Sequence, residues 1–111
     1  MTDIIIIYGP TAVGKSKVGV ELAKLVNGEV ISADSMQIYK HLDVGSAKVT
    51  NEEMDGIVHH MINIKEPNED YSVSDFCEDC KKCIKDIKSR GKVPVIVGGT
   101  GLYLKSLISE F

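Results

Sequence analysis

Apolar residues in this chain form short continuous runs separated by longer stretches with helical periodicity. Three of the runs predict strands, namely Thr2–Tyr8, Glu29–Ser32 and Val93–Val97. The first contains four consecutive isoleucines, which is typical of a parallel strand buried on both faces, so we expect it to be central in its sheet. Two longer stretches predict helices, Lys15–Val26 and a cysteine-containing segment that ends at Arg90.

The order of these elements predicts how they are connected. The strand Thr2–Tyr8, the helix Lys15–Val26 and the strand Glu29–Ser32 form a βαβ unit, so both strands are expected to be parallel and to end at the same edge of the sheet. Asn27 and Gly28 end the helix. The apolar residues that recur at helical spacing, and are predicted to pack on the sheet, are Val18, Leu22 and Leu25.

The second helix contains the pattern C-x-x-C-x-x-C, which resembles a metal-cluster motif. At about 100° per residue, however, the three thiols fall on one apolar arc, and the charged residues lie outside it. No fourth ligand is evident, so we interpret the cysteines as small buried hydrophobic residues. The arc consists of Val73, Phe76, Cys77, Cys80, Cys83, Ile84 and Ile87.

Composition narrows the class of protein. The 111 residues allow one domain, 43% of them are hydrophobic, and no apolar run approaches a membrane span. No secretory leader is recognised, and three crowded cysteines suit a reducing cytoplasm better than a disulfide framework. The formal charge of −3 argues against broad nucleic-acid binding by these residues alone, so any such contact is expected to be local.

The candidate chemistry begins directly after the first strand, where residues 9–16 read G-x-x-x-x-G-K-S. This pattern, placed between a strand and a helix, predicts a phosphate-binding loop. Backbone N–H groups and the helix N-terminus would surround a diphosphate or triphosphate, Lys15 would add a positive charge, and Ser16 would ligate Mg²⁺. The loop residues are Gly9, Pro10, Thr11, Ala12, Val13, Gly14, Lys15 and Ser16.

Other candidate residues lie between the second and third predicted strands. Asp34 is expected at the same edge as the phosphate loop. Its carboxylate could act in the chemistry, by accepting a proton or holding a metal-bound water, or it could cap the N-terminus of a helix. Its position in the sequence does not favour one of these two roles over the other. Between Asp43 and Asn68 the chain is predicted to be loop-rich, and Lys48 is either a phosphate contact or solvated. His59 and His60 are interpreted as a structural pair in a strand, one inward and one outward.

Several segments together resemble one family. They occur in the order and approximate spacing of the tRNA dimethylallyltransferase (tRNA isopentenyltransferase) family and cover nearly the whole chain. Small departures occur at Ser46, Val58 and Asn63, outside the phosphate loop. The matching segments are Gly9–Ser16, Ile31–Tyr39, Asp43–Lys48, His59–Ile62, Tyr71–Phe76 and Gly98–Tyr103.

The resemblance implies transfer of a dimethylallyl group from dimethylallyl diphosphate to N6 of the adenosine next to the anticodon in tRNA. It implies that Asp34 is the general base and that Thr11 contacts the diphosphate near the breaking bond. Lys15 and Mg²⁺ would stabilise the leaving group. The residues that it implies for tRNA binding are Asp34, Ser35, Met36, Gln37 and Thr100.

We therefore expect an α/β, P-loop NTPase-like three-layer fold with a mainly parallel sheet, incomplete at its C-terminus. By resemblance, residues 1–111 are the N-terminal catalytic core of a longer protein, which is expected to be cytoplasmic and monomeric at full length. The helical insertion and the C-terminal part that grip the anticodon stem-loop are expected to lie outside these residues. Three alternatives stay open, an adenylate isopentenyltransferase, a P-loop nucleotide or small-molecule kinase, and a non-catalytic nucleotide-binding module in which Asp34 is dispensable. The strand ending at Val97 continues into Gly98 and not into Asp, which weakens an ATPase interpretation.

Overall fold

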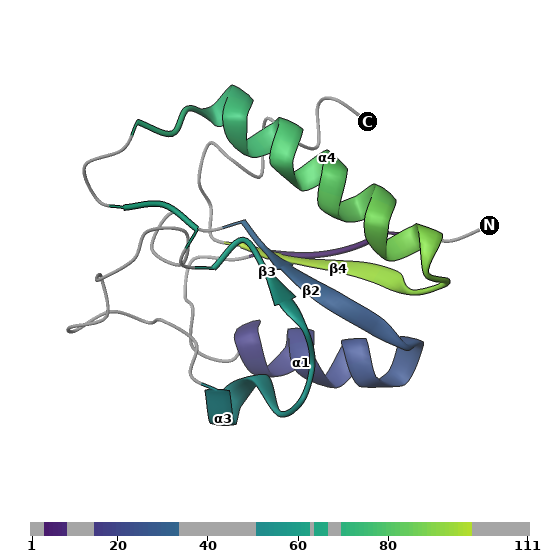
Figure 1. Ribbon diagram of the computed structural model, residues 1–111. Helices are drawn as coiled ribbons and strands as arrows, with labels where there is room; N and C mark the ends of the chain where they lie inside the picture. The colour runs from purple at the N-terminus through teal and green to yellow at the C-terminus, as the bar shows by residue number, and fades with distance from the viewer. Residues whose placement is uncertain (1–3, 9–14, 34–50, 63, 67–69, 99–111) are drawn as a thin grey trace.

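The computed structural model describes residues 4–8, 15–33, 51–62, 64–66 and 70–98. Their four strands form one sheet in the order β1-β4-β2-β3, and every neighbouring pair is parallel. Helix α4 covers one face of the sheet, and α1 and α3 cover the other (Figure 1). The elements are β1 (Ile5–Tyr8), α1 (Lys15–Val26), β2 (Gly28–Ser32), α3 (Asn51–Met54), β3 (His59–His60), α4 (Val73–Ser89) and β4 (Val93–Gly98).

This arrangement confirms the predicted α/β class, the three layers and the parallel βαβ unit. The region from Asp43 to Asn68, predicted to be loop-rich, contains the short elements α3 and β3 in its described part. No helix in the described ranges is long and apolar enough to cross a membrane.

The predicted central position of β1 is wrong for the described sheet. β4 lies between β1 and β2, and β1 is at the edge. The burial agrees with this position, because Ile6 is 37% exposed whereas Val95 and Ile96 of β4 are completely buried. The isoleucine run correctly predicted a strand, whose described part begins at Ile5. Which strand becomes central depends on the connection through α4, which places β4 between β1 and β2.

The predicted sheet-facing side of α1 is also wrong. Val18 and Leu25 are 47% and 81% exposed, and the helix instead packs on the sheet through Gly19 and Ala23, with Val26 half-buried beside them. The reason is the short distance between helix and sheet, since a Cβ added to Gly19 would lie 2.6 Å from Cγ2 of Val97. Small residues are required at this contact, and hydrophobicity alone could not identify it.

Helix α4 confirms the predicted arc. A capping box begins the helix, because the Asp75 N–H donates to Ser72 Oγ and the Ser72 N–H donates to the Asp75 carboxylate, both at 3.1 Å. Arg90 is the C-cap, and Gly91 follows with φ +74°. The buried residues of the helix are Phe76, Cys77, Cys80, Ile84 and Ile87, with Cys83 half-buried.

The three thiols are part of the core between α4 and the sheet, where they pack with Ile31 and Ile96. Cys80 is completely buried, and this burial raises the pKa of its thiol to about 12. A thiol with so high a pKa stays protonated at neutral pH and is a poor nucleophile. The structure therefore confirms that the cysteines pack as small hydrophobic residues.

Replacing Cys80 with Ala in the full-length protein that contains this chain is expected to lower the free energy of unfolding by about 1 kcal/mol. The loss is small because only one sulfur atom is removed, compared with the several atoms of a large aliphatic side chain. Urea denaturation measures it, with Lys82→Ala on the exposed side of α4 as the matched control. Stoichiometric zinc or iron in tag-free protein, lost in Cys80→Ala, would contradict the packing interpretation.

Candidate functional site

The candidate site lies at the carboxyl edge of the parallel sheet. Tyr8 at the end of β1 is paired with Gly98 at the end of β4, and the Ala33 N–H after β2 donates to the Val97 carbonyl at 2.8 Å. Three strand ends are thus held together by backbone hydrogen bonds. In open α/β sheets this edge is where ligands bind.

The predicted functional segments all continue directly from these strand ends. The phosphate-loop residues Gly9–Gly14 follow Tyr8, and Lys15 and Ser16 form the beginning of α1. Asp34–Gln37 follow Ala33, and Thr100 comes two residues after Gly98. The structure confirms that a strand precedes the motif and that a helix begins at Lys15.

The individual site residues remain predictions. The loop residues Gly9, Pro10, Thr11, Ala12, Val13 and Gly14, together with Asp34, Ser35, Met36, Gln37, Lys48 and Thr100, lie outside the described residues.

The end of β4 approaches the end of β2 very closely. A Cβ added to Gly98 would lie 2.8 Å from both the carbonyl oxygen and the Cβ of Ala33, which is itself 2% exposed. Only glycine fits at this position without a backbone shift. The first glycine of the Gly98–Gly101 stretch therefore has a packing role, because it lets the end of β4 approach Ala33 at the end of β2.

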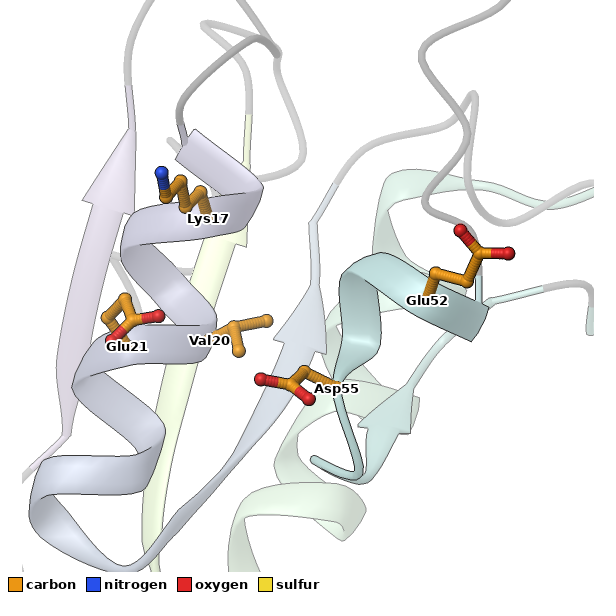
Figure 2. Close-up of a pocket in the computed structure, with 5 residues that line it drawn as sticks. All are labelled: Lys17, Val20, Glu21, Glu52 and Asp55. Atoms are coloured by element: carbon orange, nitrogen blue, oxygen red, sulfur yellow. The ribbon is translucent and has the colours of Figure 1, made fainter.

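A groove of about 270 Å³ lies between α1 and α3, near the start of α1 (Figure 2). Its lining combines the amine of Lys17 with the carboxylates of Glu21, Glu52 and Asp55, above the buried Val20. Three carboxylates against one amine disfavour an anionic ligand. The groove is therefore separate in its chemistry from the phosphate site that the loop predicts.

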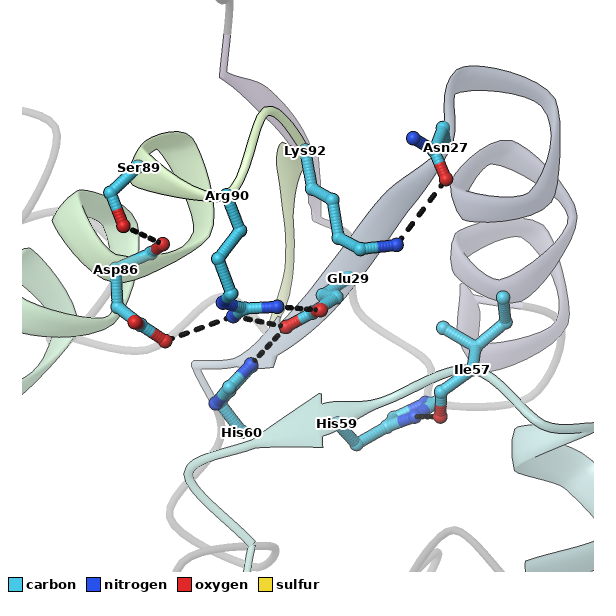
Figure 3. A network of polar contacts seen from close by, with 9 residues as sticks. All are labelled: Asn27, Glu29, Ile57, His59, His60, Asp86, Ser89, Arg90 and Lys92. Carbon is cyan, nitrogen blue, oxygen red and sulfur yellow. Dashed lines mark hydrogen bonds and ion pairs between the residues drawn. The ribbon is translucent and has the colours of Figure 1, made fainter.

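The most strongly connected polar group in the described residues was not predicted. Glu29 is only 3% exposed, although it lies in an apolar strand (Figure 3). Arg90 binds both of its carboxylate oxygens, with Nη2 at 2.8 Å from Oε1, and also donates to Asp86 at 2.9 Å. His60 Nε2–H donates to Glu29 Oε1 at 2.7 Å. These contacts join β2, β3 and the end of α4.

The electrostatics of Glu29 follow from these contacts. The hydrogen bonds from Arg90, followed by the one from His60, lower the pKa of Glu29 to about 2, although burial acts in the opposite direction. Glu29 is near the start of β2, roughly 13 Å along the strand from Ala33 at ~3.3 Å per residue. It is therefore a structural charge, far from the carboxyl edge. An acidic residue within an apolar strand could have indicated a buried charge from the sequence. Its partners Arg90 and His60 could not be identified in this way, because they are distant in the chain.

The two adjacent histidines form a strand, as predicted, and their side chains lie on opposite faces. His60 is paired with Ile31 on the α4 side, and His59 with Val30 on the α1 side. The prediction of one inward and one outward residue is wrong, because both are half-buried. His59 Nδ1–H donates to the Ile57 carbonyl at 2.8 Å, and burial lowers its pKa. Neither side chain belongs to a group of three or more metal-ligating residues in the described ranges.

The sequence from residue 37 to residue 111 matches the family model described as IPP transferase. The match covers more than half of the chain and contains α3, β3, α4 and β4. The chain belongs to the IPP transferase family. The N-terminal phosphate loop lies before the matched residues, so its assignment rests on its own pattern and context.

Individual IPP transferases support this assignment. The chain is 61% identical over 96% of its length to a tRNA dimethylallyltransferase of Caldanaerobacter subterraneus, of which it covers 34%. It superimposes with a TM-score of 0.93 on the crystal structure of the full-length tRNA isopentenylpyrophosphate transferase from Bacillus halodurans, with 53% identity, covering all of this chain and 37% of that one. A eukaryotic dimethylallyltransferase acting on tRNA gives a TM-score of 0.89 at 43% identity, covering 96% of this chain and 27% of that one. The chain thus spans about a third of the length of the curated relatives that it matches.

Glu29→Gln in the full-length protein is expected to lower the free energy of unfolding by about 2 kcal/mol at neutral pH, because it leaves Arg90 and His60 without the carboxylate. The pKa of Glu29 falls from its ordinary 4.5 to about 2 on folding, so its contribution is complete above pH 4.5 and is lost as the pH falls toward 2. Unmodified protein should lose stability through this interval, and Glu29→Gln should lose less. Urea denaturation at several pH values, with the exposed Glu78→Gln as control, measures both. Parallel pH profiles would contradict an ionised Glu29.

Proposed function

We propose that the full-length protein transfers a dimethylallyl group from dimethylallyl diphosphate to N6 of the adenosine next to the anticodon in tRNA, releasing diphosphate. The observation that carries the proposal is the convergence of three strand ends at one edge, from which the phosphate loop, the Asp34 segment and the Gly98–Thr100 segment continue. Relatives named tRNA dimethylallyltransferase support the choice of reaction.

The donor half of the site belongs to the loop and the start of α1. Backbone N–H groups of residues 9–16, with Thr11 and Lys15, bind the diphosphate and stabilise the negative charge that builds as the allylic C–O bond breaks. Residues 15 and 16 form the first turn of a 12-residue helix, where backbone N–H groups have no partner within the helix. This is the end of a helix that favours an anion.

The residues present also fit Mg²⁺. A serine hydroxyl is a hard oxygen ligand, and a diphosphate supplies further oxygens, which suits an ion that keeps several waters. Ser16 would hold the ion beside the diphosphate. When bound, Mg²⁺ neutralises charge on the leaving group.

The acceptor half belongs to the segments after β2 and β4. An exocyclic amine is a weak nucleophile, so a carboxylate must accept its proton as the C–N bond forms, and Asp34 takes this role. Ser35, Met36 and Gln37 line the adenosine site, and Thr100 contacts the tRNA. Because a stacked base cannot reach such a site, the adenine is flipped out of the loop.

This chain forms the N-terminal P-loop core, residues 1–111, of a cytoplasmic protein that is monomeric at full length. The grip on the anticodon stem-loop comes from a helical insertion and a C-terminal part outside it. The formal charge of −3 supports this division, because extensive phosphate contact requires clustered lysines and arginines.

Donor and acceptor choice is tested by incubating the full-length protein with radiolabelled dimethylallyl diphosphate, tRNA and Mg²⁺, in parallel with AMP as acceptor and with ATP as donor. The label is expected in tRNA, at the adenine N6, as measured by nucleoside mass spectrometry. Label in AMP and not in tRNA would indicate an adenylate isopentenyltransferase. Phosphoryl transfer from ATP without prenylation would indicate a kinase.

Two substitutions separate the donor residue from the base. Lys15→Ala is expected to weaken diphosphate binding and lower turnover together, because the charge acts on both the bound donor and the leaving group. Asp34→Asn should leave donor affinity nearly unchanged and lower kcat by at least ~100-fold, the usual scale for a positioned acid or base. Isothermal titration and single-turnover kinetics measure the two effects. Near-normal kcat with a lower melting temperature would show that Asp34 is a helix cap.

A further inference from the structure

Helix α4, which covers one face of the sheet, becomes strongly basic over its second half (Figure 1). Lys81, Lys82 and Lys85 are exposed, and Lys88 is half-buried. At about 100° per residue, all four side chains leave the helix outside the buried arc that packs on the sheet. These four residues are the α4 basic patch.

The patch is a local concentration of positive charge in an acidic chain. Residues 81–92 contain six of the 13 lysines and arginines but one of the 16 acidic residues, in a chain with a formal charge of −3. That one acid, Asp86, accepts a hydrogen bond from Arg90 at 2.9 Å. Within the part of the chain that the structure describes, no residue bonds to the last three lysines of the patch. Their charge is therefore not matched by described carboxylates.

Helix stability does not explain the patch. Basic residues near a C-terminus interact favourably with the helix dipole, but this effect is confined to the last turn, where Lys88 is the basic residue. Lys81, Lys82 and Lys88 each lie three or four residues from Lys85, a spacing at which like charges destabilise a helix. Lysines clustered along the face of a helix are typical of a surface that meets phosphate groups.

We propose that the α4 basic patch binds the sugar-phosphate backbone of the tRNA acceptor. The inference rests on the proposed function, which supplies a polyanion as substrate. Successive turns of the helix present a positive charge about every 5 Å, so several phosphates can be contacted together. A lysine binds phosphate as a point charge and reads no base, so the contact contributes affinity without sequence preference.

The position of the patch indicates which part of the tRNA it meets. Helix α4 ends just before Val93, where β4 begins at the amino edge of the sheet. Lys81 is eight residues after the helix start at Val73, which is about 12 Å along the axis, and the other patch residues lie further still from the carboxyl edge. The patch therefore contacts backbone away from the modified adenosine. It adds a local contact to the grip that the proposed function assigns to other parts of the protein.

Charge complementarity favours RNA over a protein segment of this chain as the occupant. A segment that covered the patch would have to bring several carboxylates together. The acidic residues outside the described ranges are instead scattered singly along the sequence, at Asp3, Asp34, Asp43, Glu69 and Glu110. A phosphate backbone carries a charge at every nucleotide and needs no such arrangement.

The test measures the salt dependence of tRNA binding by the full-length protein, by fluorescence anisotropy without dimethylallyl diphosphate. In Lys82→Gln/Lys85→Gln, the slope of log K against log salt concentration is expected to become shallower by about 1.5, since each lysine-phosphate contact contributes about 0.7–0.9. The matched control, Lys82→Arg/Lys85→Arg, should keep the slope because it keeps the charge. Lys17→Gln/Lys24→Gln, with the same loss of charge on α1 across the sheet, should also keep it.

Normal tRNA binding with an unchanged slope in Lys82→Gln/Lys85→Gln would overturn this inference and leave the proposed function intact. Failure of the unmodified protein to bind tRNA would instead remove the proposed function. An equal loss of slope in the α1 variant would also overturn the inference, because net charge and not the patch would then be responsible. Patch-dependent binding to phosphatidylserine vesicles, with the tRNA slope unchanged, would identify a lipid surface as the partner.

Lysine acetylation of the unmodified protein gives a readout that needs no variant. With tRNA bound, Lys82 and Lys85 should react at least about fivefold more slowly with an acetylating reagent than in the free protein, as measured by mass spectrometry. Lys24 on α1 serves as the internal control and should react at the same rate in both states. Equal rates for Lys82 and Lys85 with and without bound tRNA would refute the contact.

Discussion

The structure depends on the backbone hydrogen bonds that β4 makes on both of its edges. Val95 is in register with Ile5 of β1 on one side and with Val30 of β2 on the other, so three strands that are distant in sequence become parallel neighbours. Because the strands run in one direction, their carboxyl ends meet at one edge. The segments predicted to carry chemistry follow those ends in the sequence, so the pairing of one strand brings together the three points from which they continue.

Close packing around β4 explains why small residues appear where larger ones would be expected. Gly19 allows α1 to approach Val97, and Gly98 allows the end of β4 to approach Ala33. On the other face, thiols fill the space between α4 and the sheet, with Cys80 completely buried. Interiors of this density leave no room for an added methyl group, so residue size matters as much as hydrophobicity.

The two edges of the sheet have different electrostatic functions. At the amino edge, the buried carboxylate of Glu29 is held by Arg90 and His60, which ties β2, α4 and the two-residue strand β3 together. Such a carboxylate is expensive to bury unless its hydrogen bonds are satisfied, as they are here. At the carboxyl edge, the beginning of α1 is where the proposed function places the diphosphate, because backbone N–H groups at a helix N-terminus favour an anion. The fixed charge network is thus separated along the strands from the edge where the ligand site is predicted.

The sequence by itself determined the α/β class, the parallel βαβ unit and the cysteine arc of α4, because each depends on local spacing, an apolar run or a helical period. The phosphate loop, read from a fixed motif, stays a prediction. Only the tertiary structure decided that β4, and not β1, is interior among the described strands, that α1 turns Gly19 and Ala23 to the sheet in place of Val18 and Leu25, and that Glu29 is bound by Arg90. These outcomes depend on which elements approach each other and how closely. That information is shared between residues far apart in the chain, so no local pattern contains it.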